Sequence, residues 1–285
     1  MKALRAFALL FLIVSVLLPV SCTPSTSTSS TPAVTVHFID VGQGDSILID
    51  CGETEVLIDG GKSSPGVVDY LNAYVDGPLD VMVATHTDAD HIGGLIAVLE
   101  NYQVGDIWIN GFVATSKTYK DFMALVNAEG AAVHEAVLGN VIRAGTLEFK
   151  VLNPPDTLFS DANNNSIVIV FSYGDVDFIF TGDAEKEAEE AMLLQGVFPV
   201  PDVEVLKVGH HASRSASSVE FLDVVKPEIA VYMCALDNDY DHPHPETITA
   251  LNAIGVVIYG TENYGTIKIT TDGKTYSVQT EKTPE

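Results

Sequence analysis

The chain contains the stretch Thr85-His86-Thr87-Asp88-Ala89-Asp90-His91-Ile92-Gly93-Gly94. It follows the apolar run 81–84, which predicts a buried strand, and leads into residues 92–100, whose apolar spacing predicts a helix. The turn between them holds four ligand-type side chains: His86, Asp88, Asp90 and His91. Such side chains repel one another or stay unpaired unless a cation lies among them. Mixed nitrogen and oxygen donors predict a site for zinc, manganese or iron rather than for calcium or copper(I).

Two later turns also place ligand-type residues directly after apolar strands. Asp183 follows, after one glycine, the predicted strand 176–181. A carboxylate there can reach a shared centre, and capping of the next helix is the alternative role. His210 and His211 follow the predicted strand 203–208 in the same way.

A further pair of histidines, His242 and His244, follows the predicted strand 229–233 and an acidic loop. Each precedes a proline, which limits the conformations of the loop and lowers the entropy cost of holding a ligand. His37 and His134 match no such pattern, and we expect both to be structural.

The run His86-x-Asp88-x-Asp90-His91 resembles the signature loop His-x-His-x-Asp-His of the metallo-β-lactamase superfamily, with Asp88 in place of the second histidine. The variant with aspartate there is similar to the hydrolase domain of ComEC-type competence proteins, and it also resembles phosphorylcholine esterases that act on teichoic acids. Residues 36–46 match the start of the ComEC-type domain. The resemblance covers roughly residues 34–278 and implies an αββα sandwich, whereas alternating strands and helices alone allow other α/β folds.

The resemblance also implies roles for individual residues. It implies metal ligands at His86, Asp88, Asp90 and His91, at Asp183 as a bridge between two metals, and at His242 or His244. A catalytic histidine that is not a ligand is expected at His210 or His211, with metal ligation as the competing assignment. Positions beside the metals or the substrate are expected for Asp45, Asp59, Asn165 and Lys207.

Some of these expected roles have simpler alternatives. Asn165 lies where many superfamily members have a metal-binding histidine, so one of the two metal sites lacks a ligand. Its amide is a poor zinc ligand but can orient water or phosphate oxygens, whereas a plain Asn-rich turn is the alternative. Asp59 either supports the metal loop or simply ends a strand. Lys207 either helps to bind an anion or lies at the surface.

These roles predict metal-assisted hydrolysis with one or two divalent ions, zinc or manganese. Asp90 or Asp183 orients the attacking water, and His210 or His211 assists the leaving group. The leading hypothesis is a phosphodiesterase or nuclease-like enzyme. The alternatives are hydrolysis of a small envelope ester, such as a phosphorylcholine ester or a lactone, and a tethered protein that binds through its metal pocket without turnover. Asp88 and the missing mid-chain histidine argue against β-lactam hydrolysis.

The composition restricts the partners. The net charge is −25, and no cluster of Lys and Arg predicts a broad basic surface for nucleic acid. Bound metal ions supply positive charge locally, so the expected substrates are small molecules or phosphodiesters, single-stranded nucleic acid included.

Cys51 and Cys234 lie in or beside apolar runs, and we expect them to be buried and unbridged.

The N-terminal residues predict export. Residues 1–22 combine Lys2 and Arg5, an apolar run too short for a comfortable transmembrane helix, and a small residue before Cys22, as in a signal peptide. Cys22 resembles a lipoprotein processing site, which predicts a lipid anchor at the outer face of the cell membrane. Pro19 stands where an aliphatic residue is usual, so simple secretion is the alternative. Residues 23–33 are predicted to form a flexible Ser/Thr/Pro tether, residues 34–280 the hydrolase domain and residues 281–285 a tail.

Overall fold

Strands with apolar side chains on both faces dominate the computed structural model, which describes residues 32–63, 66–196, 198 and 203–284. In β9 (Val168–Tyr173), Ile169 and Phe171 join one buried cluster, whereas Val168 and Val170 join another. A strand that is apolar on both faces is stable only when another layer covers each face. The alternation within β9 therefore requires a sheet in the interior of a layered structure.

The first sheet has eight strands within the described residues, in the order β15-β14-β1-β2-β3-β4-β5-β6. The neighbouring pairs from β3 to β6 are parallel, and the other pairs are antiparallel. Its strands are β1 (Val34–Phe38), β2 (Ile47–Cys51), β3 (Thr54–Ile58), β4 (Leu79–Val83), β5 (Val104–Ile109), β6 (Ala132–Glu135), β14 (Ile267–Thr271) and β15 (Tyr276–Thr280).

The second sheet has seven strands among the residues that the structure describes, in the order β13-β12-β11-β10-β9-β8-β7. The pairs from β10 to β13 are parallel, and those from β7 to β10 are antiparallel. Besides β9, its strands are β7 (Val141–Ala144), β8 (Leu147–Asn153), β10 (Val176–Phe180), β11 (Val205–Lys207), β12 (Ile229–Tyr232) and β13 (Val257–Gly260).

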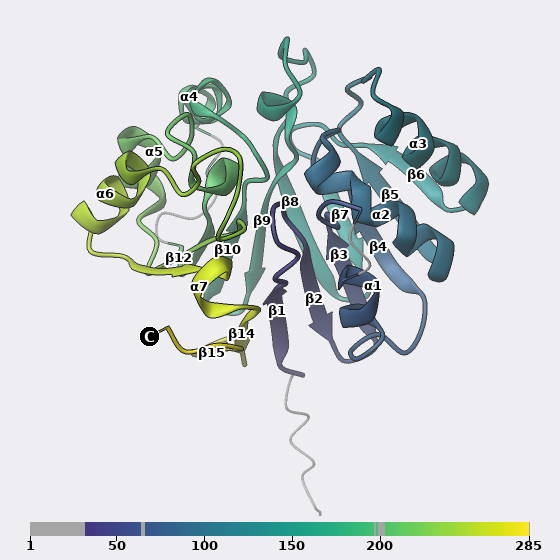
Figure 1. The fold of residues 1–285 in the computed structure, drawn as a ribbon, viewed down its shortest axis with the longest axis horizontal. Coiled ribbons are helices and arrows are strands. Elements are labelled where there is room, and N and C mark those ends of the chain that lie inside the picture. Colours follow the sequence, from purple (N-terminus) through teal and green to yellow (C-terminus); the bar gives the residue numbers. More distant parts are fainter. Residues whose placement is uncertain (1–31, 64–65, 197, 199–202, 285) are drawn as a thin grey trace, which may run out of the picture. The chain divides into compact units, whose positions relative to one another are not determined.

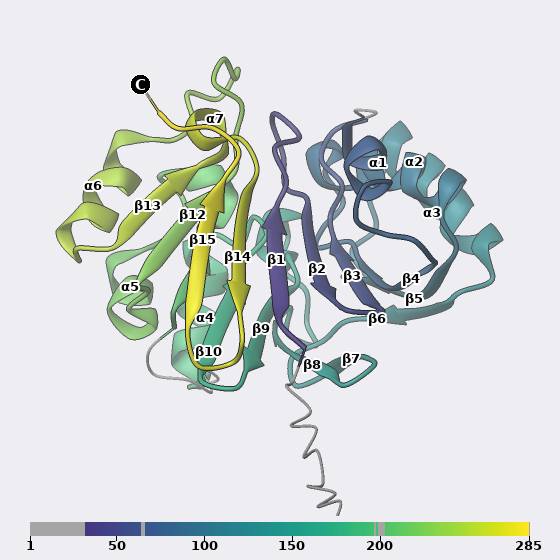
Figure 2. The ribbon, with the colours of Figure 1, turned by 90° about the horizontal axis from the view of Figure 1, so that it is seen from below.

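Helices cover the outer face of each sheet (Figures 1 and 2). Apolar residues of three helices pack on the first sheet: α1 (Gly66–Leu71), α2 (Ala89–Asn101) and α3 (Lys117–Glu129). Three others pack on the second sheet: α4 (Lys186–Gln195), α5 (Val219–Val225) and α6 (Pro245–Ala253). Three short helical segments lie in connections: the 3₁₀ turns η1 (Asn163–Asn165) and η2 (Gly209–Ala212), and α7 (Thr261–Tyr264).

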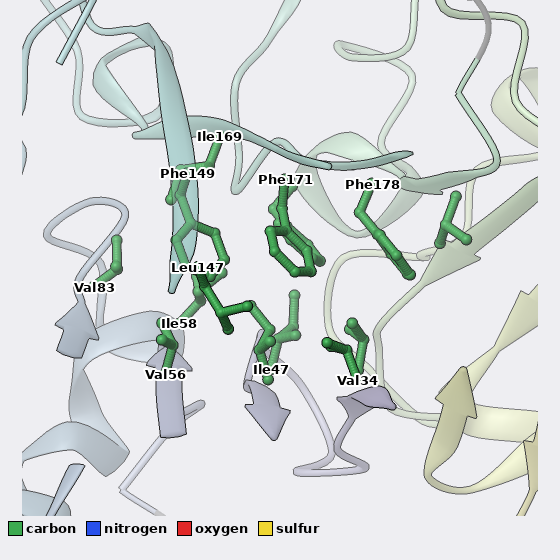
Figure 3. Close-up of a cluster of buried hydrophobic side chains, with 14 of the residues drawn as sticks. Val34, Ile47, Val56, Ile58, Val83, Leu147, Phe149, Ile169, Phe171 and Phe178 are labelled. Carbon is green, nitrogen blue, oxygen red and sulfur yellow. The ribbon is translucent and has the colours of Figure 1, made fainter. Parts of the chain in front are cut away.

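The two sheets face each other across a shared core (Figure 3). Val34 and Ile47 of the first sheet and Phe149, Phe171 and Phe178 of the second belong to this core, and each is at most 1% exposed. Burying an aromatic or branched side chain stabilises a fold by about 1.5–3 kcal/mol, so this core fixes the two sheets relative to each other. The strand ends that carry the ligand-type residues are thereby fixed as well.

The αββα sandwich predicted from the sequence is confirmed. Four of the strands and α-helices were not predicted: β6, β7, α5 and α7. Each has only four to seven residues, and β6 is an edge strand with mostly exposed side chains, so its hydrophobic pattern is weak. Cys51 and Cys234 are buried and free, as expected.

The two histidines expected to be structural lie outside the ligand-type turns. His37 is buried and its Nδ1 lies 2.7 Å from the hydroxyl of Tyr70, whereas His134 Nε2 lies 2.6 Å from Asp106 Oδ1. The predicted signal peptide and nearly all of the predicted tether lie outside the described residues. Among the residues that the structure does describe, none of the helices has the length and apolar character to cross a membrane.

Candidate metal centre

The ligand loop, residues 85–91, connects β4 to α2. His86 and Asp88 precede the helix, and Asp90 and His91 lie in its first turn, with Asp88 as an N-cap residue whose side chain makes no capping hydrogen bond. The turn after β1 approaches this loop so closely that a Cβ atom on Gly44 would lie 2.0 Å from the backbone oxygen of Asp90. Only glycine fits there, and the close approach brings the next residue of the β1–β2 turn to the centre.

Four side chains, which we call the first ligand group, lie close together around His211 Nε2: Asp90, His91, Asp183 and His211 itself. His91 Nε2 lies 3.3 Å from both His211 Nε2 and Asp183 Oδ1. His211 Nε2 lies 3.4 Å from Asp183 Oδ2 and 3.5 Å from Asp90 Oδ2. Tetrahedral coordination at about 2.0–2.1 Å separates ligand atoms by about 3.3–3.4 Å. The separations among His91, Asp183 and His211 therefore match those of donors around a single divalent cation, and Asp90 lies at a similar distance from His211.

The hydrogen bonds of the two imidazoles direct both Nε2 atoms into this group. His91 Nδ1 donates to Asp59 Oδ2 at 2.7 Å, and His211 Nδ1 donates to the Met233 carbonyl at 2.8 Å. In the neutral rings, both Nε2 lone pairs then face each other at 3.3 Å, which is repulsive unless a proton or a metal ion lies between them. Asp59 is itself held by the backbone N–H and the hydroxyl of Thr85, at 2.8 and 2.6 Å.

A second ligand group lies on the other side of Asp183 and consists of His86, Asp88, Asp183 and His210. Asp183 Oδ2 lies 3.8 Å from His86 Nε2 and 3.6 Å from His210 Nε2, and Asp88 Oδ2 lies 3.9 Å from His86 Nε2. His86 Nε2 and Asp183 Oδ1 are buried and lack a hydrogen-bond partner within the described part of the chain. Buried polar atoms without partners are costly, so this group also fits a cation, although its atoms are spread more widely.

The charges within the centre are strongly coupled. Burial lowers the pKa of His91 and of His211, but Asp183 more than offsets this and raises both well above the usual value. Burial raises the pKa of Asp183, but the neighbouring His211 and His91 hold it well below its usual range. Burial and His91 lower the pKa of His86 to about 3. A divalent cation in the first ligand group would compete with protons for the same donor atoms.

His210 faces the open side of the centre, with 22% of its side chain exposed. Its Nδ1 lies 2.8 Å from Glu185 Oε1, which also accepts a hydrogen bond from the Ser215 hydroxyl at 2.9 Å. His210, His211 and Ala212 have φ of 45°, 53° and 62°, a left-handed conformation that costs a non-glycine residue about 1 kcal/mol or more. Because of this backbone conformation, the adjacent imidazoles of His210 and His211 point toward different ligand groups.

The predicted ligand at His242 or His244 stays a prediction. His211 lies in the first ligand group, and the buried Nδ1 of His242 lacks a hydrogen-bond partner within the described part of the chain. The ring of His242 lies beside the centre, 5.5 Å from the ring of His210 between centroids, and burial and His211 lower its pKa to about 4. His244 caps α6, and its Nδ1 accepts a hydrogen bond from the backbone of Arg214 at 3.1 Å.

Asn165 and Lys207, predicted beside the metals or the substrate, both have side chains that contact other parts of the protein. The Asn165 amide does not face the centre, because it bonds the backbone of Phe159 and Asp161 and so holds the loop before β9. Lys207 is not a surface residue, because its side chain is fully buried and paired with Asp45 at 2.6 Å, and Asp45 in turn lies 3.2 Å from His211 Nδ1.

Asp45 and Asp59 do lie beside the ligands, as expected. The potential ligand atoms of Asp45, His91, Asp183 and His211 all lie within 4.8 Å of one another. Asp45 nevertheless approaches His211 from its Nδ1 side, at 3.2 Å, whereas the first ligand group meets at Nε2. We therefore place Asp45 behind His211 and not among the atoms that converge on the cation.

The sequence did not reveal Glu185, Ser215 or the Met233 carbonyl as parts of the site. Glu185 is the N-cap residue of α4 in extended conformation, two residues after Asp183, and its side chain turns to His210. A carboxylate at the start of a helix is common because it interacts favourably with the helix dipole, so nothing in the sequence pattern distinguished Glu185 as part of the site.

A buried centre of imidazoles and carboxylates in an αββα sandwich defines a candidate metal-binding protein. The sequence profile of the Metallo-beta-lactamase superfamily matches residues 33–235. The chain therefore belongs to the metallo-β-lactamase superfamily, as its signature loop suggested.

Two relatives carry the resemblance to ComEC-type proteins. ComE operon protein 3 of Bacillus subtilis is 33% identical over 254 residues, which cover 82% of this chain and 32% of that protein. Competence protein ComA of Neisseria gonorrhoeae is 30% identical over 252 residues, which cover 87% of this chain and 34% of the relative. The chain thus spans about a third of the length of these relatives.

The fold has a counterpart among solved structures. The metallo-β-lactamase fold protein YhfI from Bacillus subtilis superposes with a TM-score of 0.56 at 15% identity, over 83% of this chain and 99% of that one. At this identity the likeness concerns the fold alone, and the chemistry has to be argued from the site.

Proposed function

We propose that the chain is a metal-dependent phosphodiesterase, nuclease-like in its chemistry. The observation that carries this proposal is the first ligand group, in which His91, Asp183 and His211 have the donor spacing of a cation site and Asp90 lies beside His211, with His210 next to it on the open side. The ligand loop, Asp183 and the two histidines after β11 come from distant parts of the sequence. Their convergence supports a catalytic centre rather than an incidental acidic turn.

A divalent cation bound here supplies Lewis acidity toward a phosphoryl oxygen and makes a water molecule more acidic. The residues of the chain do the rest. Asp183 holds both ligand groups at one carboxylate, and Asp90 closes the first group from the helix side. Asp59 keeps the Nδ1 proton of His91 in place, so that Nε2 stays available as a ligand.

We assign proton transfer to the leaving oxygen to His210. Burial lowers its pKa, but Asp183 and Glu185 more than offset this and raise the pKa above its usual value. A protonated His210 can donate from Nε2 while Glu185 accepts from Nδ1, which fixes the ring. The ring of His242 lies next to that of His210, and the half-exposed Tyr240 stacks on His242 with 5.7 Å between the ring centroids.

A phosphodiester fits this arrangement better than a lactam. A cation in the first ligand group and a protonated His210 can meet the oxygens of an anionic phosphoryl group, whose charge the acidic protein would otherwise repel. The matched relatives are named for competence, which supports a nucleic acid as the diester. A small envelope ester, such as a phosphorylcholine ester, has the same anionic group and is the second candidate. A tethered protein that binds without turnover is the third.

We further propose that the bound ion is manganese or zinc, and that the protein acts outside the cytoplasm. The carboxylate-rich donor set supports manganese, and the tetrahedral spacing of the first ligand group supports zinc. The basic and apolar residues before Cys22 support export, with lipidation at that cysteine. Mass spectrometry of protein recovered from expressing cells tests this, because an unmodified N-terminus at Met1 contradicts export.

Three substrates test the enzymatic proposal: bis-p-nitrophenyl phosphate, single-stranded DNA and nitrocefin, each with zinc or manganese. We expect turnover of the two diesters and a decrease in kcat of about 100-fold or more in His210→Ala, the usual effect of losing a general acid. His134→Ala is the matched control, because His134 also pairs with a carboxylate but lies outside the centre, and it should retain activity.

Two results would overturn the proposal. Turnover of nitrocefin alone would show that the substrate class is wrong. Metal retention without turnover of any diester, a phosphorylcholine ester included, would favour a binding protein.

A further inference from the structure

Lys207 ends β11 with a side chain that has no exposed surface. Its ammonium lies 2.6 Å from Asp45 Oδ2 and donates to the Val208 carbonyl at 3.0 Å. Among the described residues, it is the one lysine or arginine that is buried. An ammonium is stable at such depth only beside a compensating charge, so the pair with Asp45 is a requirement of its position.

Asp45 connects Lys207 to the first ligand group. Its second oxygen, Oδ1, lies 3.2 Å from His211 Nδ1, and its side chain is 2% exposed. The Nδ1 proton of His211 is donated to the Met233 carbonyl, so Asp45 adds a negative charge along this edge of the ring. The order in space is therefore ammonium, carboxylate and imidazole, and then the Nε2 atom that faces the other ligands.

We propose that Lys207 and Asp45 are positioning residues that set the cation affinity of the first ligand group. Asp45 orients His211 from the Nδ1 side, and Lys207 cancels the charge of Asp45. The charge that attracts the cation is then that of the ligands alone. The inference rests on the proposed function only in requiring that the centre bind a divalent cation.

Charge cancellation predicts opposite effects from the two ends of the pair. Removing the ammonium leaves an uncompensated carboxylate beside the centre, which attracts a divalent cation more strongly. Removing the charge of Asp45 leaves an uncompensated ammonium, which repels it. If the pair served only to pack His211, breaking it from either end would weaken cation binding in the same direction. The sign of the change therefore separates the two roles.

The experiment compares the full-length chain with Lys207→Met, with Asp45→Asn and with the double variant. Mn²⁺ is titrated into metal-free protein, and the free ion is measured by electron paramagnetic resonance. We expect Asp45→Asn to raise the dissociation constant about tenfold or more and Lys207→Met to lower it. The double variant should stay within about threefold of the wild type. Lys186→Met, which removes a charge from an exposed lysine, should have little effect because solvent screens it.

Equal weakening in both single variants would overturn the proposal. If Lys207→Met does not fold without metal, the comparison of Asp45→Asn with the double variant decides, and equal dissociation constants there would also overturn it. Thermal unfolding without metal reports folding of each variant separately. Failure of the wild type to bind Mn²⁺ or Zn²⁺ would count against the proposed function instead, since no affinity would exist for the pair to adjust.

Discussion

Strand β3 carries a buried carboxylate near each end, and the two have opposite surroundings. Glu55, at its start, is 5% exposed, and Asp59, directly after its end, is fully buried. Asp59 accepts hydrogen bonds from Thr85 and from His91 Nδ1. Glu55 instead lies among other acids, with Asp50 as its cross-strand partner and Asp80 accepting a hydrogen bond from its backbone N–H.

The difference shows that burial of a carboxylate does not by itself make a metal centre. Burial, together with the nearby Asp80 and Asp50, raises the pKa of Glu55 to about 7. At the other end, imidazoles surround the carboxylates, and their second nitrogens remain available as ligands. The structure thus assembles donors at one end of the sheet and only like charges at the other.

Among the substitutions that test this difference, Asp183→Asn should cause the largest loss of activity and of bound metal. Asp183 contacts His86, His91, His210 and His211, so the substitution removes the charge that both ligand groups share. We expect kcat/KM on bis-p-nitrophenyl phosphate to fall about 1,000-fold or more, with loss of bound metal. Elemental analysis after gel filtration, beside initial rates, measures both. Full activity in this variant would show that the shared carboxylate is not part of the working centre.

Asp59→Asn should have an intermediate effect. The carboxylate fixes the ring of His91 without converging on the cation, and loss of such a partner usually weakens metal binding about 10- to 100-fold. Calorimetric titration with Zn²⁺ measures the change. Glu55→Gln provides the control from the other end of β3, and its Zn²⁺ affinity should match the wild type. Equal affinities in both variants would mean that Asp59 does not support the centre.

The sequence predicted the parts of the site that follow from strand ends. His86, Asp90 and His91 cluster in the turn that follows β4, and Asp183 follows β10. Because both segments follow the ends of apolar strands, their side chains were predicted to lie near one another. The resemblance to a known family added the sandwich, which alternation of strands and helices alone left open. Both predictions rest on short motifs, and a short motif can be recognised directly in the sequence.

The different roles of the later histidines could not be predicted from the sequence. His210 and His211 are adjacent in sequence, and only their left-handed backbone turns one toward the ligands and the other toward the open side. The burial of Lys207 could not be predicted either, because its partner, Asp45, lies far away in the sequence. Such partners depend on how the two sheets meet, which no local pattern contains.

Glu55→Gln should have the smallest effect, on stability rather than on activity. The pKa of Glu55 rises from 4.5 to about 7 on folding, so the folded state binds the proton more tightly. The stability that this proton contributes is present below about pH 4.5 and is lost as the pH rises through 7. Glutamine cannot ionise and keeps the shape of the protonated acid. We expect the variant to be more stable than the wild type by about 1–2 kcal/mol at pH 8, less than the full shift because solvent screens part of it.

Urea unfolding at pH 4 and pH 8 measures this difference, and the two proteins should be equally stable at pH 4. An equal gain at both pH values would mean that the glutamine stabilises by packing and not by removing a charge. Diesterase activity should stay unchanged at either pH, because Glu55 lies at the end of β3 away from Asp59 and the ligands. A carboxylate without nearby donors would then be shown to lower the stability of the fold at neutral pH, whereas the carboxylates at the other end serve the metal centre.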